Sequence, residues 1–172
     1  MSRHALFAAL ALALVCDAAN AATPLSIAWT ITPDGLGPLK IGMTPKQAQA
    51  ALGRKVTTDN TFDASCRPYE VEGVESLSLL FMDGKLDSID FSDGSAWKTA
   101  AGVKVGDTDA AIRKAYGAAA HKTKAEYDGP PAGYFTVRGP GPHGIKFTTD
   151  ATRKITNIDV GGASIGFVEG CA

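Results

Sequence analysis

A motif that occurs twice is the feature that most constrains the fold of this chain. The sequence Lys-Ile-Gly-Met-Thr at residues 40–44 returns as Lys-Val-Gly-Asp-Thr at residues 104–108, an offset of 64 residues. Three apolar positions and a glycine keep the same offset: Ala48, Ala51, Leu52 and Gly53 correspond to Ile112, Ala115, Tyr116 and Gly117. Self-similarity at a fixed spacing indicates that one structural unit occurs twice.

Each copy predicts a short helix that begins directly after the turn. In the first copy Thr44 is a good N-cap residue, Pro45 suits the first helical position, and Gln47 completes a capping box. A glycine then suits the left-handed position that ends a helix. Helices of about nine residues are unstable alone, so packing must hold them. The turn and cap residues expected in the two copies are Gly42, Thr44, Gly53, Gly106, Thr108 and Gly117.

A β-hairpin is expected after each helix. In the first copy, Asp83-Gly84 between two apolar runs is a strong signal for a two-residue hairpin turn. The second copy has a looser turn at residues 150–153. Strict alternation breaks at the same place in both copies, between apolar residues that are three positions apart: Leu86 and Ile89, and Ile155 and Ile158. The shared break suggests a β-bulge in each hairpin.

These patterns predict an α+β fold class. We expect a first unit at residues 22–98 and a second unit at residues 99–172, each with a short helix packed on an antiparallel β-sheet. The patterns leave open whether the two sheets join edge to edge.

The first 21 residues have the pattern of a secretory signal peptide. A polar start precedes an apolar run over residues 5–15, and Ala19 and Ala21 form a small-x-small cleavage signal. The alternative is a buried N-terminal helix. Cys16 would suit a lipoprotein, but Val15 stands where a lipobox needs a small residue. No apolar run reaches the roughly 18–20 residues of a transmembrane helix. We therefore expect cleavage near Ala21 and a periplasmic or secreted mature chain.

Two cysteines, Cys66 and Cys171, remain after the expected cleavage. An even number in an oxidising compartment predicts one disulfide, which would close a loop of about 106 residues. Two free thiols are the alternative. Neither cysteine has the spacing of a metal ligand or of a CxxC redox motif.

The helix motif at residues 41–53, hydrophobic-Gly-Met-Thr-x-x-x-Ala-x-x-x-Leu-Gly, resembles the opening of the SmpA/OmlA family of small outer-membrane lipoproteins, which includes the BamE proteins. Two such units in tandem in a secreted chain resemble the β-lactamase inhibitory proteins. The second copy departs from the motif at Asp107, and one long-range bridge differs from the one-per-repeat bridges of the inhibitors. The resemblance implies a non-catalytic envelope protein that binds other proteins.

Motifs for catalysis, metals, phosphates and nucleic acids are weak or missing. Residues 162–166 match GxSxG, but no histidine follows, so a glycine-rich turn is the better interpretation. His121 and His143 lack metal-ligand spacing. Asp87 and Asp90 miss a calcium-loop pattern and are expected on the solvent side of a hairpin strand. A net charge of −1 argues against nucleic-acid binding. We expect no catalytic residue, metal or cofactor.

The predicted function is a secreted or periplasmic binding module for an envelope or secreted protein, acting as an inhibitor or an assembly factor. Aromatic residues near turns are common binding anchors. The candidate binding surface comprises Trp97, Tyr127, Tyr134, Phe135 and His143. Alternatively, these aromatic residues cover the ends of the sheets. A glycan or small-ligand binding protein, with Trp97 and Tyr134 stacking on sugar, is the second hypothesis, and a small enzyme is the third. The patterns do not indicate an oligomeric state.

Overall fold

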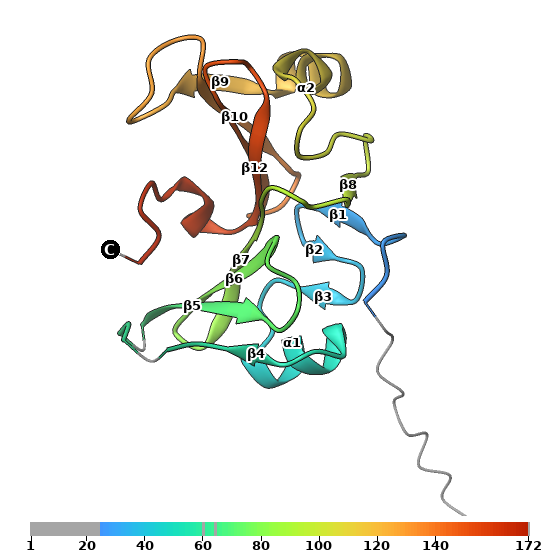
Figure 1. The fold of residues 1–172 in the computed structure, drawn as a ribbon, viewed down its shortest axis with the longest axis vertical. Helices are drawn as coiled ribbons and strands as arrows, with labels where there is room; N and C mark the ends of the chain where they lie inside the picture. The colour runs from blue at the N-terminus through green and yellow to red at the C-terminus, as the bar shows by residue number, and fades with distance from the viewer. Residues whose placement is uncertain (1–24, 60, 64, 172) are drawn as a thin grey trace, which may run out of the picture.

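Two β-sheets and two short α-helices make up the computed structural model, which describes residues 25–59, 61–63 and 65–171 (Figure 1). The larger sheet has eight strands, and every neighbouring pair is antiparallel. In sheet order they are β4 (Val56–Thr57), β5 (Cys66–Val71), β6 (Leu77–Met82), β7 (Lys85–Phe91), β12 (Ile155–Gly161), β11 (Gly144–Thr149), β10 (Gly133–Arg138) and β9 (His121–Lys124).

The smaller sheet has four strands, with β1 and β8 parallel. In sheet order they are β3 (Leu39–Lys40), β2 (Gly35–Leu36), β1 (Thr30–Thr32) and β8 (Lys98–Thr99). The helical elements are α1 (Pro45–Leu52), α2 (Asp109–Tyr116) and the 3₁₀ turns η1 (Gly117–Ala119) and η2 (Ala163–Gly166). The helices α1 and α2 lie at opposite ends of the molecule, with the paired strands β7 and β12 between them (Figure 1).

The predicted α+β class, two separate helix-on-sheet units, is wrong because the chain is mostly β. Each α-helix has eight residues, whereas strands from both halves of the chain join in one sheet. The junction is the β7–β12 pair, where Ile89 faces Val160 and Phe91 faces Ile158. The unit boundaries at residues 22–98 and 99–172 stay a prediction.

Both predicted bulges are confirmed. The register between β6 and β7 skips Asp87, and the register between β11 and β12 skips Thr156. These two bulged residues lie 69 positions apart in the sequence. The predicted turn before β7 is also confirmed, because Asp83 and Gly84 have positive φ values of 48° and 73°, as a two-residue hairpin turn requires. Each half of the large sheet is therefore bent at the same point of its central hairpin.

The repeated motif ties the start of each helix to a central strand. In both copies the turn exchanges two backbone hydrogen bonds with the residue before the bulge. The bonds run from Gly42 N to Leu86 O (2.7 Å), Leu86 N to Met43 O (2.7 Å), Gly106 N to Ile155 O (2.8 Å) and Ile155 N to Asp107 O (2.7 Å). These bonds satisfy backbone N–H and C=O groups of the turn and of the strand at the same time. This shared role accounts for the presence of the same turn in both copies of the motif.

The helix caps agree with the prediction more fully in the first copy than in the second. The Thr44 hydroxyl accepts a bond from the Gln47 N–H (3.3 Å), and the Gln47 side chain accepts one from the Thr44 N–H (2.9 Å). Gly53, with φ of 62°, ends α1 in the left-handed conformation. Thr108 precedes α2 with an extended backbone but makes no side-chain cap bond, and Gly117 follows the helix with φ of 54°.

The core lies on one face of the large sheet, where α1, α2 and the small sheet cover it. Burial alternates along β6 and β11, so that every second side chain points inward. The largest fully buried side chains are Phe81, Phe91, Phe135, Phe147, Ile31, Leu36, Leu39, Leu52, Leu77, Leu79, Leu86 and Ile89. The opposite face of the central strands carries polar side chains and is partly covered by η2 and the segment that follows it.

The predicted disulfide is confirmed. Cys66 at the start of β5 is bonded to Cys171, and the two Cα atoms are 5.5 Å apart. The bridge fixes the segment that follows η2 against the first half of the large sheet.

The predicted signal peptide, with its cleavage site near Ala21 and with Cys16, lies outside the described residues. Within the described ranges, no helix is both long and apolar enough to cross a membrane.

Replacing Gly161 by alanine should destabilise the central strand pair. Gly161 has φ of 140°, and an added Cβ would lie 2.0 Å from the Asp87 carbonyl oxygen. We expect Gly161→Ala to lower the free energy of unfolding by about 3 kcal/mol or more, measured by urea denaturation. Gly141→Ala is the matched control, because a Cβ there meets nothing within 4 Å. Equal stability of the two variants would contradict the strain at Gly161.

Removing the disulfide should lower the melting temperature (Tm) of the mature protein. The chain-entropy estimate for a loop of about 106 residues is 4–5 kcal/mol, equivalent to roughly 10 °C in a domain of this size. We expect this loss in Cys171→Ser and in reduced wild type, measured by thermal unfolding. Reductant should leave the Tm of the double variant Cys66→Ser/Cys171→Ser unchanged. Two free thiols in a nonreducing mass spectrum would contradict the bridge.

Candidate functional site

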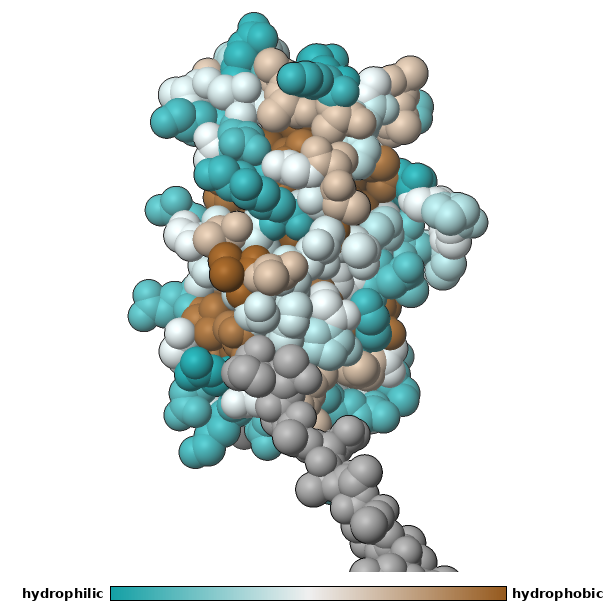
Figure 2. Space-filling view, turned by 90° about the vertical axis from the view of Figure 1, so that its right-hand side faces the viewer, coloured by the Kyte–Doolittle hydropathy of each residue, from teal (hydrophilic) through white to brown (hydrophobic). Residues whose placement is uncertain are grey.

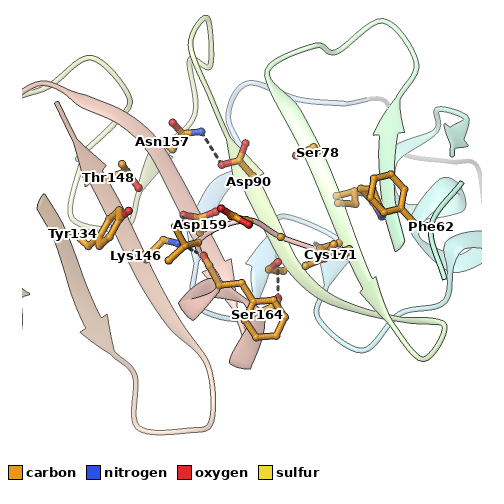
Figure 3. Close-up of a pocket in the computed structure, with 18 residues that line it drawn as sticks. Phe62, Ser78, Asp90, Tyr134, Lys146, Thr148, Asn157, Asp159, Ser164 and Cys171 are labelled. Atoms are coloured by element: carbon orange, nitrogen blue, oxygen red, sulfur yellow. Dashed lines mark hydrogen bonds and ion pairs between the residues drawn. The ribbon is translucent and has the colours of Figure 1, made fainter. Parts of the chain in front are cut away.

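A cleft of about 460 Å³ lies on the face of the large sheet opposite the core (Figure 3). We call it the sheet cleft. Its floor comes from the four central strands β6, β7, β12 and β11, and the segment after η2 forms one wall. The polar side chains that line it are Ser78, Ser88, Asp90, Tyr134, Lys146, Thr148, Asn157, Asp159, Ser164 and Glu169.

Two aspartates meet at the centre of the cleft floor. Asp90 on β7 and Asp159 on β12 are directly opposite each other in the strand register, and their carboxyl groups lie side by side (Figure 3). The Asn157 side-chain amide donates to Asp90 Oδ2 at 3.0 Å. Lys146 Nζ lies 3.4 Å from Asp159 Oδ2. We call Asp90 and Asp159 the carboxyl pair.

The carboxyl pair titrates abnormally because it is removed from water. Burial raises the pKa of Asp159 to about 7; the charge of Lys146 opposes this increase, and the charge of Asp90 adds to it. Burial also raises the pKa of Asp90, against the hydrogen bond from Asn157. Near neutral pH the pair therefore takes up or releases a proton far above the usual range of aspartate.

The neighbours of the two carboxyls are unequal. Across the ladder, Asp159 faces Lys146 on β11, whereas Asp90 faces Ser78 on β6. The carboxyl pair thus shares one lysine. That lysine is largely covered, with 13% of its side chain exposed, and its Nζ lies 5.5 Å from the centre of the Tyr134 ring.

The cleft wall after η2 is held in place at several points. The Ser164 N–H donates to Asp87 Oδ2, and its hydroxyl donates to Ser88 Oγ, both at 2.8 Å. Lys146 Nζ donates to the Phe167 carbonyl at 3.3 Å. The Tyr127 hydroxyl donates to Glu169, and Cys171 completes the wall through the disulfide. Ser164, the serine of the GxSxG match, is therefore a buried structural residue in a 3₁₀ turn.

Apolar side chains form part of the cleft edge. Phe62 is 37% exposed, Phe167 is 40% exposed and Val168 is 47% exposed, and all three line the cleft. We call these three residues the apolar rim.

On the side of the molecule that lies to the right in Figure 1, hydrophobic residues occur in small groups among hydrophilic ones (Figure 2).

The aromatic residues predicted to form one binding surface are separated in the structure. Trp97 and Phe135 are 5% and 0% exposed, so the expectation that they are surface anchors is wrong. Trp97 packs edge-on against Phe91 at 5.9 Å, and its Nε1–H donates to the Ser26 carbonyl at 2.9 Å. Phe135 occupies an inward position of β10, because side chains alternate along a strand.

The other three predicted residues have different surroundings. Tyr134, next to Phe135 on β10, points to the opposite face and lines the sheet cleft. Tyr127 is 71% exposed and reaches the cleft wall through its bond to Glu169. The fifth candidate, His143, lies outside the cleft lining, and its Nδ1 is 2.7 Å from Asp34 Oδ1.

Sequence reasoning missed the carboxyl pair, Lys146 and Asn157. A signal was present, because Asp90 and Asp159 are separated by the same 69 residues as the two bulges. Asp87 and Asp90 were expected on the solvent side of a hairpin strand; Asp90 does lie on the face opposite the core, but its carboxyl is largely buried in the cleft, and Asp87 sits at the bulge and binds η2. Within the described ranges, no group of three or more His, Cys, Asp or Glu side chains is placed to hold a metal ion.

Comparisons with known proteins give no assignment. No protein-family model and no curated protein matches the sequence. Among solved structures, a DUF4309 family protein (YjgB) from Bacillus subtilis has a TM-score of 0.47 and 14% identity, covering 74% of this chain and 84% of that chain. The uncharacterized protein yfeY from Escherichia coli has a TM-score of 0.43 and 22% identity, covering 77% of this chain and 99% of that chain.

The raised pKa of Asp159 predicts a pH-dependent stability. Its carboxyl binds a proton more tightly in the folded chain than in the unfolded chain, where 3.8 is the ordinary value. This contribution is complete below about pH 4 and is lost as the pH rises through about 7. We expect the free energy of unfolding to fall over that window by on the order of 2–4 kcal/mol, measured by urea denaturation at several pH values.

Asp159→Asn should flatten this pH dependence, because the amide does not titrate. Asp93→Asn makes the same chemical change in an exposed turn outside the cleft and should keep the wild-type slope. An Asp159→Asn profile as steep as the wild-type profile would contradict the assignment of the titration to the carboxyl pair.

Proposed function

We propose that this protein is a non-catalytic binding module of the periplasm or the extracellular medium, and that its protein partner binds at the sheet cleft. In this proposal the chain carries two copies of one unit, and the face made by their central strands is the binding surface. The disulfide is in keeping with an oxidising compartment. Inhibition of the partner or assistance in its assembly are the two forms that such binding would take.

One observation carries the proposal: the side chains of the apolar rim are exposed to solvent at the edge of a cleft whose floor carries the carboxyl pair. Aromatic and aliphatic side chains at the edge of a cleft provide contact area, and polar groups in its floor provide orientation. Phe167 and Val168 keep 40% and 47% of their surface exposed although they belong to a tail that is fixed at Ser164 and Cys171. A segment held at both ends that presents apolar side chains to solvent is suited to contact a partner.

A small ligand is the second candidate, because the cleft volume of about 460 Å³ is typical of small-molecule sites. Tyr134 lines the cleft and remains available for stacking on a sugar, whereas the burial of Trp97 removes that residue from the hypothesis. A thermal-shift screen with saccharides tests this candidate. A stabilising saccharide whose effect disappears in Tyr134→Ala would favour it over a protein partner.

Crosslinking in the envelope of the source organism tests the main proposal. We expect the tagged mature chain to capture an envelope or secreted protein in stoichiometric amount. The rim variant Phe167→Ser/Val168→Ser should reduce capture about tenfold, since it removes apolar contact area without touching the core. Ile27→Ser is the matched control, because Ile27 is 64% exposed and lies outside the cleft. Equal capture by the rim variant and wild type would contradict the proposal, and so would the absence of any partner.

A further inference from the structure

We infer that the sheet cleft recognises a cationic side chain, an arginine or a lysine, on an exposed segment of the partner protein. In this arrangement the charged end lies at the carboxyl pair and the aliphatic stem lies against the apolar rim. The inference deepens the proposed function and rests on it.

The charges around the cleft favour a cation. Three acidic side chains line it, Asp90, Asp159 and Glu169, against one basic side chain, Lys146. That lysine is already engaged, because its Nζ contacts Asp159 Oδ2 and donates to the Phe167 carbonyl. This single lysine serves both carboxyls of the pair, and it contacts Asp159 directly, whereas Asp90 faces a serine across the ladder.

The position of the carboxyl pair sets the kind of group that can reach it. The pair lies on the floor, while the exposed apolar side chains stand at the edge. A ligand must therefore pass an apolar surface before its charge meets the carboxylates. Arginine and lysine have this shape, with an apolar stem and a charged end, and they bury their stems along apolar surfaces. The cleft volume of about 460 Å³ accommodates such a side chain together with part of its backbone.

Proton release should accompany binding. Near neutral pH the buried carboxyl pair holds a proton that an incoming cation replaces, as the raised pKa of Asp159 indicates. The charged group in contact with the pair is Lys146 from β11, while Glu169 in the wall after η2 lines the same cleft and accepts a bond from Tyr127. The titration of the carboxyl pair therefore sets how strongly the cleft attracts a cation. Binding of a cation should therefore strengthen as the pH rises from 5.5 to 8.

Two tripeptides that differ only in charge test the inference. The probes are acetyl-Phe-Arg-Phe-amide and acetyl-Phe-citrulline-Phe-amide, since citrulline keeps the shape of arginine without its charge. We expect the arginine peptide to bind about tenfold more tightly at pH 8, measured by NMR titration, with the largest amide shifts at Asp90, Asn157 and Asp159. The preference should shrink about tenfold at pH 5.5, and the citrulline peptide should show little pH dependence.

A variant that adds a cation to the cleft gives a second test, because it should abolish the preference for arginine without destabilising the fold. Ser78→Lys places a second lysine opposite Asp90, as Lys146 lies opposite Asp159. We expect it to fold with wild-type or higher Tm and to lose the preference for the arginine peptide. Asp90→Asn should show the same loss, and Asp93→Asn should bind as wild type. Equal binding of the two peptides, no binding of either up to millimolar concentration, or an unchanged preference in Ser78→Lys would overturn the inference.

The envelope capture experiment separates this inference from the proposed function. Loss of capture in both the rim variant and Ser78→Lys supports both. Loss in the rim variant alone overturns the cation inference and leaves the binding module intact. Undiminished capture by both variants overturns both, because the partner would then bind elsewhere.

Discussion

The backbone pairing of β7 with β12 is the interaction on which the rest of this structure depends. Without it, each half of the large sheet would end in a strand with unpaired N–H and C=O groups along a largely apolar edge. Pairing the two edges satisfies these groups and extends a single core from Phe81 to Phe147 under both halves. The same pairing brings Asp90 against Asp159, so the contact that unites the sheet also creates its charged centre.

The position of this contact explains why two like charges meet in a folded protein. The β7–β12 pair is antiparallel, and its register places Asp90 directly opposite Asp159. The lysine on one side only, Lys146 opposite Asp159 with Ser78 opposite Asp90, compensates half of the added charge. The excess of carboxyl groups over cations at the centre of the sheet thus follows from the pairing of β7 with β12.

Local features could be predicted from the sequence because nearby residues determine them. The capping box of Thr44, the Asp83-Gly84 turn and the two bulges each depend on a few adjacent side chains. The disulfide followed from the number of cysteines and the expected compartment. The prediction of the fold class was wrong because some strands have no apolar periodicity. In β9, for example, the sequence is His-Lys-Thr-Lys and every side chain is exposed.

The candidate site was harder to predict, because it depends on pairing between distant strands. The burial of Trp97 and Phe135 follows from which face of each strand packs on the core, and a nearby turn does not reveal that face. The carboxyl pair requires the register between β7 and β12, which no local pattern specifies. The equal 69-residue separation of the bulges and of the two aspartates was the single trace of it in the sequence.

The disulfide also imposes an order on the assembly of the protein. Cys66 precedes β5, whereas Cys171 follows every strand of both sheets. During synthesis, Cys66 therefore has no partner until all the strands have been made and Cys171 follows. The wall of the cleft is consequently the last part of the molecule that the bridge can fix. The native bridge can therefore form only after every strand of both sheets has been synthesised.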